Sequence, residues 1–142
     1  MISLSSLLNT GNTETISDLW DRTFLNYTPE KPDSWLDPEG LIQDDLQLPQ
    51  NAVPLLSFLL DQPHGPELHR DRIQAYCEFF AAVWQTKFSA GEWKTALPFL
   101  KRCAELWQNQ KLFTRLADAV EKAIFAEGSL SVKTETPLFN GK

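Results

Sequence analysis

The stretch FSAGEWKTALPFLKRCAELW, residues 88–107, decides how this chain folds. Ser89 is followed three residues later by Glu92, the capping-box pattern that begins a helix. Apolar residues then recur at helical spacing, at Trp93, Ala96, Leu97, Leu100, Cys103, Ala104 and Trp107. Pro98 interrupts the hydrogen bonding of a helix but not this spacing. We therefore predict one helix, bent at Pro98 and concave toward the core, with the Lys94 carbonyl exposed on its outer edge.

Helical periodicity also extends to both sides of this stretch. Further helices are expected over residues 4–8, 13–27, 51–62 and 66–88, and a last one from Leu112 to a C-cap at Gly128. No segment alternates convincingly as a strand would. The pattern predicts an all-α, single-domain antiparallel helical bundle of four to six helices.

Length and composition favour one domain. The 142 residues suffice for a single core, and 42% hydrophobic with 23% charged residues is ordinary for a globular protein. We expect a helical domain over residues 1–128 and a flexible tail over 129–142. Within the domain, an acidic arm and loop (1–50) precede the helical body (51–128). Residues 28–50 form a long loop that is rich in proline and acids.

Acidic residues are concentrated in the first third of the chain. Residues 1–50 have a net charge of −7, whereas residues 51–142 have a net charge of +1. An acidic arm either is an ordinary solvated surface or steers the protein toward a basic partner. Trp35, within the same arm, either plugs the helical body or presents a partner-binding surface.

The chain carries no sign of secretion or membrane insertion. Its N-terminus lacks a basic segment followed by a cleavage site, and its apolar runs are far shorter than a membrane helix needs. Cys77 and Cys103 fall on apolar helix faces, which predicts buried free thiols, with a disulfide or redox role as the alternative. We expect a soluble, cytoplasmic protein with no membrane contact.

Part of the central region resembles a known repeat. Gly91 occupies an inter-helix turn and Trp93 an aromatic position, and small residues follow at Ala96 and Cys103. With large residues such as Phe80 before the turn, residues 80–106 resemble one tetratricopeptide repeat, a helical hairpin. The resemblance implies an interaction scaffold, although Trp84 and Gln108 depart from the family pattern. A generic antiparallel bundle explains the same spacing.

No residue pattern typical of catalysis or metal binding is present. His64 and His69 lack the spacing that places two ligands on one helix face, and no third soft ligand follows. Phosphate-binding and nucleophile motifs are absent from the sequence, and the carboxylates lie in segments that look exposed. We expect neither enzymatic activity nor a metal or cofactor.

Nucleic-acid binding is the alternative function. Nine bases against six acids in residues 70–122 would suit a small helical subunit of a ribonucleoprotein complex that contacts the nucleic-acid backbone through a basic helix face. The acids are interleaved with these bases, and the isoelectric point near 4.8 opposes such binding.

Aromatic residues are in surplus, with five tryptophans and nine phenylalanines. Core packing is the ordinary explanation for each, but aromatic side chains also anchor protein interfaces. We predict a non-enzymatic protein–protein interaction adaptor, a scaffold or chaperone-like assembly factor. It would bind a segment of a partner protein in an aromatic groove between the helices of residues 66–88 and 90–107. The candidate contact residues are Tyr76, Trp84, Trp93, Phe99, Lys101, Arg102, Trp107 and Trp35.

Overall fold

A computed structural model describes residues 3–23, 28, 30–31 and 45–135 of the chain. In these residues seven helices follow one another: α1 (Leu4–Thr10), α2 (Thr13–Thr23), α3 (Pro49–Leu60), α4 (Gly65–Leu68), α5 (Arg70–Lys87), α6 (Ala90–Leu106) and α7 (Lys111–Glu135). No strand occurs among them, apart from an isolated bridge between Thr28 and Lys31. The all-α fold class is confirmed, with seven helices where four to six were expected. Trp35 lies outside the described residues.

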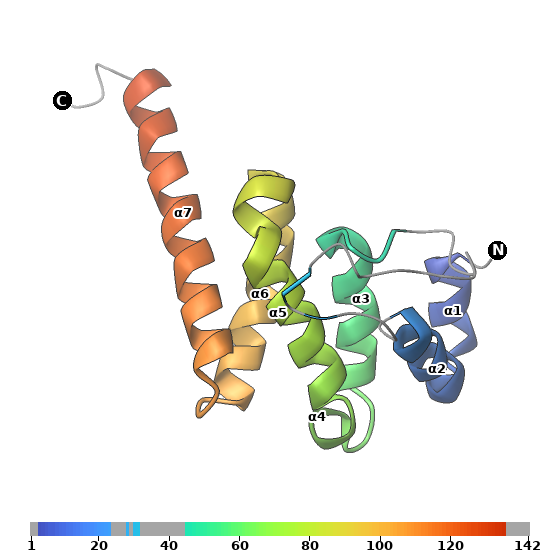
Figure 1. The fold of residues 1–142 in the computed structure, drawn as a ribbon. Coiled ribbons are helices and arrows are strands. Elements are labelled where there is room, and N and C mark those ends of the chain that lie inside the picture. The colour runs from blue at the N-terminus through green and yellow to red at the C-terminus, as the bar shows by residue number, and fades with distance from the viewer. Residues whose placement is uncertain (1–2, 24–27, 29, 32–44, 136–142) are drawn as a thin grey trace.

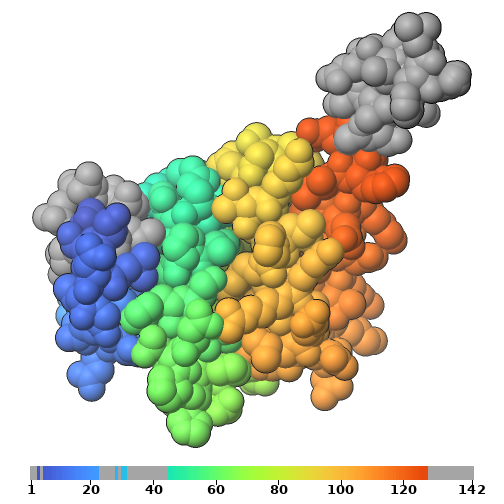
Figure 2. All heavy atoms as spheres, turned by 180° about the vertical axis from the view of Figure 1, so that it is seen from behind, coloured from blue at the N-terminus to red at the C-terminus, as the bar shows by residue number. Residues whose placement is uncertain are grey.

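The helices form two layers around one core. Viewed from behind, α1, α3, α6 and α7 lie side by side in that order (Figure 2). Helix α6 makes the most extensive contacts in the fold, with α7 and with α3. Helix α5 crosses the other side of this layer, with α4 at its lower end and α2 beside it (Figure 1). Helix α6 is therefore covered on several sides.

The quoted stretch forms one continuous helix, as predicted. Helix α6 contains Pro98, and the carboxylate of Glu92 accepts hydrogen bonds from the backbone N–H and hydroxyl of Ser89 at 3.0 and 2.9 Å. Pro98 and Lys94 are both exposed, so the proline lies on the solvent side. Phe99, expected beside the apolar stripe, is instead only 4% exposed. The buried face is displaced toward Phe99 because α6 packs against α3 as well as α7.

Several predicted boundaries were wrong. Helix α3 spans Pro49–Leu60 rather than residues 51–62, so the last two residues of the loop expected over 28–50 are helical. The helix expected over residues 66–88 is interrupted at His69, which separates α4 from α5. The left-handed backbone of His64 (φ 61°) starts α4, and Gly65 packs so closely on the end of α3 that a Cβ there would lie 2.3 Å from the Leu60 carbonyl oxygen. Gly128 does not end the last helix, because α7 continues to Glu135. A glycine inside a helix costs only about 1 kcal/mol relative to alanine, which its helix-forming neighbours can offset.

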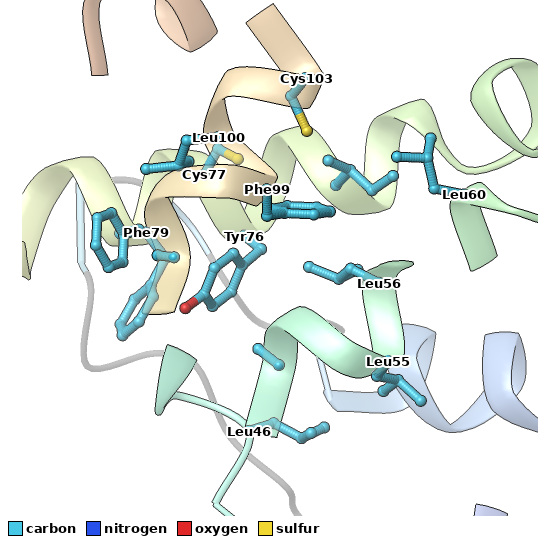
Figure 3. Close-up of a cluster of buried hydrophobic side chains, with 14 of the residues drawn as sticks. Leu46, Leu55, Leu56, Leu60, Tyr76, Cys77, Phe79, Phe99, Leu100 and Cys103 are labelled. Atoms are coloured by element: carbon cyan, nitrogen blue, oxygen red, sulfur yellow. The ribbon is translucent and has the colours of Figure 1, made fainter. Parts of the chain in front are cut away.

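Most of the aromatic residues that the structure describes are buried in the core. Tyr76 lies 6.4 Å from Trp20, 6.1 Å from Phe79 and 6.2 Å from Phe80, measured between ring centroids. Tyr76, Phe79 and Cys77 of α5 face Phe99, Leu100 and Cys103 of α6 and the leucines of α3 (Figure 3). Each such fully buried side chain contributes about 1.5–3 kcal/mol. Both cysteines are free and buried, as predicted.

Candidate protein-binding site

Three of the predicted contact residues belong to the core. Tyr76, Trp84 and Phe99 are 0%, 6% and 4% exposed, and burial raises the pKa of Tyr76 well above its usual value. The surplus of aromatic residues predicted a groove between the two helices, but α5 packs against this face of α6 (Figure 3). These three side chains therefore stabilise the fold and do not line a surface in this structure.

Trp93 connects α5 to α6. Its indole Nε1 donates to the carbonyl oxygens of Trp84 and Phe88, both at 2.7 Å, and its ring packs edge-on against Trp84 with centroids 4.8 Å apart. These carbonyls lie at the C-terminal end of α5, where the backbone needs partners from outside the helix. Trp93 is half-buried and fixes the turn between the two helices.

Lys101 and Arg102 form ion pairs with neighbouring elements. Lys101 contacts Glu121 of α7, and Arg102 contacts Asp61 at the end of α3, each at 2.5 Å. All four side chains are about half exposed, so each pair contributes roughly 0–1 kcal/mol. The charges of Lys101 and Arg102 are thus each paired within the protein.

Trp107 lies at an open depression of about 490 Å³ between the start of α5 and the end of α6. The depression is lined by Pro66, Glu67, Arg70, Asp71, Leu106 and Trp107. Trp107 is half-buried against Phe113, with ring centroids 5.1 Å apart, and Leu106 beside it is 44% exposed. Of the predicted contact residues that the structure describes, Trp107 best combines an anchored ring with an accessible surface.

Charged side chains line this depression together with its apolar residues. Arg70 pairs with Asp71 at 3.7 Å, and the Asp71 side chain is 93% exposed. Glu67 lies 3.2 Å from Nδ1 of His64, again at the surface. Apolar side chains next to charged, solvated ones are common in protein interfaces.

A second depression, of about 520 Å³, lies between α2 and the junction of α4 with α5. It is lined by Thr13, Glu14, Ser17, Asp18, Asp21, Leu68, His69 and Arg72. Sequence reasoning missed it, because its two walls are about fifty residues apart in the chain. The one signal in the sequence was the break in periodicity at Leu68 and His69, which leaves Leu68 exposed.

Arg72 organises this second depression. Its Nε and Nη2 each donate to the Asp21 carboxylate at 2.7 Å, and Nη1 lies 2.9 Å from Nδ1 of His69. Because a guanidinium only donates, Nδ1 accepts and the His69 proton resides on Nε2. Burial, and secondly the charge of Arg72, lowers the pKa of His69, whereas the bond to Asp21 raises the pKa of Arg72.

The thiol of Cys77 is buried and is not activated. Burial, together with contact with Cys103, raises the pKa of Cys77 well above its usual value, which keeps this sulfur a thiol and a weak nucleophile. Within the described ranges, no group of three or more His, Cys, Asp or Glu side chains is placed to hold a metal ion.

The chain matches no model of a known protein family, and no curated protein or solved structure is similar to it. Over the part of the chain that the structure covers, no helix combines the length and the apolar character needed to cross a membrane.

Proposed function

We propose that this chain is a non-enzymatic adaptor or assembly factor that holds a segment of a partner protein in the depression beside Trp107, and that it acts in the cytoplasm. The observation that carries the proposal is the position of Leu106 and Trp107 in one open depression with a charged rim. The depression lies between the start of α5 and the end of α6.

Apolar contact would supply most of the affinity. An aliphatic or aromatic side chain of the partner can pack against the Trp107 ring and cover Leu106, which is now 44% exposed. The ring is pre-positioned by its packing against Phe113, so little side-chain freedom is lost on binding. Arg70, Asp71 and Glu67 then form the polar rim that sets orientation.

The alternative of a nucleic-acid-binding subunit has less support. Lys101 and Arg102, which would lead the basic face, each pair with a carboxylate of a neighbouring element. Binding a phosphate backbone would require these pairs to open or to be shared, which reduces the gain from each contact.

Affinity capture with a matched pair of variants tests the proposal. Leu106→Glu places a charge on the floor of the depression, whereas Phe125→Glu makes the same change at an exposed residue of α7. We expect the partner to be recovered with the wild-type chain and with Phe125→Glu, and to be lost with Leu106→Glu. Equal recovery with all three chains would refute the site. Circular dichroism checks that both variants remain folded.

A further inference from the structure

Short helix α4 separates the two depressions. It supplies Pro66 and Glu67 to the depression beside Trp107 and Leu68 to the one beside Arg72. Leu68 is 64% exposed and Leu106 44% exposed, and the only other strongly exposed large apolar side chain in the described residues is Phe125 of α7. An exposed leucine therefore lines each of the two depressions, Leu106 in the first and Leu68 in the second.

Acidic side chains predominate around the two depressions. The charged residues that line them are the acids Glu14, Asp18, Asp21, Glu67 and Asp71 and the bases Arg70 and Arg72. Both bases have carboxylate neighbours, and Arg72 is held by two hydrogen bonds from its guanidinium to Asp21. Arg22 pairs with Asp18 at 3.2 Å, so the surface remains negative overall with five acids and three bases. Such a surface favours a positively charged partner.

His69 provides an independent sign of a ligand. Its side chain is only 4% exposed, and its Nε2 has no hydrogen-bond partner among the described residues. Because Nδ1 accepts from Arg72, Nε2 carries a proton that needs an acceptor. A buried donor left without an acceptor is costly, and His69 is among the residues that line the second depression. Because Nε2 is itself buried, a backbone carbonyl of a bound segment would accept from it only after a small movement of the ring.

We infer that one partner segment crosses α4 between the two depressions, and that this segment is basic and apolar. One apolar side chain of the partner covers Leu106 and Trp107, and a second covers Leu68. A lysine or arginine of the partner lies beside Glu14 in the second depression. Binding of an extended or helical segment across α4 needs no rearrangement of the helices. The inference rests on the proposed function and adds the chemistry of the partner and a second contact area.

Selection from a library of random peptides displayed on phage tests both ideas with the full chain as bait. We expect the enriched peptides to combine apolar residues with an excess of lysine and arginine. Binding of a synthesised enriched peptide, measured by fluorescence anisotropy, should weaken about tenfold in Leu68→Ser and in Glu14→Lys. The matched controls on α7, Phe125→Ser and Glu127→Lys, should stay within about twofold of the wild type.

The other outcomes separate the two proposals. Peptides that require Leu106 but bind normally to Leu68→Ser and Glu14→Lys would overturn the segment that crosses α4 and leave the proposed function standing. Enrichment of acidic peptides would overturn the predicted charge of the partner. A dimer that sedimentation detects in the wild type but not in Leu68→Ser would identify a second copy of this chain as the occupant and overturn the inference. No enrichment of any peptide would count against both proposals.

Discussion

Replacement of Gly65 by alanine should destabilise the chain far more than the same change elsewhere. A Cβ at this residue would lie 2.3 Å from the carbonyl oxygen of Leu60 and 2.5 Å from that of Leu59. Both atoms are backbone, so relief to 3.0 Å requires α4 and the end of α3 to separate by about 0.7 Å. Overpacking of this kind costs about 1–3 kcal/mol, a large part of the stability of an ordinary domain.

The matched control is Gly91→Ala. Gly91 lies in the first turn of α6, and a Cβ there would meet nothing within 4 Å. Alanine should therefore stabilise the helix, by up to about 1 kcal/mol. Urea unfolding followed by circular dichroism gives both changes in the free energy of unfolding. A Gly65→Ala variant as stable as the wild type, or both variants shifting equally, would refute the close packing of α4 on α3.

Three further substitutions test the core and the polar contacts. Because burial and Arg72 lower the pKa of His69, protonation favours the unfolded chain: this contribution to stability is complete above the ordinary histidine pKa of about 6.5 and is lost as the pH falls below it. Between neutral and mildly acidic pH, the free energy of unfolding measured with urea should fall less in His69→Gln than in the wild type. Replacement of an exposed histidine, His64→Gln, is the control. An equal fall in His69→Gln and the wild type would exclude the effect. Trp93→Phe removes the donor to two carbonyls and should cost about 1–3 kcal/mol in the same assay, whereas no change would show that water replaces it. Phe80→Ala should cost about 3–5 kcal/mol and Phe125→Ala less than about 0.5 kcal/mol, and similar values would contradict the burial of Phe80.

Local signals predicted local structure well. The Ser89 and Glu92 capping box and the in-phase apolar residues gave the start and continuity of α6, because both depend on side chains within a few turns of one another. The free, buried state of Cys77 followed from its place on an apolar face in the same way. Gly128 shows the limit of such signals, since a glycine ends a helix only where the backbone leaves the helical conformation.

The candidate site depended on tertiary packing, which periodicity does not specify. Phe99 is buried because α6 contacts two other helices, so its buried face is wider than a single stripe. The contact of Arg72 with Asp21 joins residues 51 positions apart, and no local pattern predicts it. Trp107 was a candidate from the sequence, but its neighbour Leu106 was identified only from its exposure beside α4.

Amide hydrogen exchange of the wild-type chain, with and without a captured partner, shows whether a partner segment binds beside Trp107, because exchange slows where a bound segment covers the backbone. We expect slower exchange at residues 65–71 and 103–108, with little change along α7 around Phe125. Protection confined to α7, or no protection at either end of the depression, would exclude binding beside Trp107.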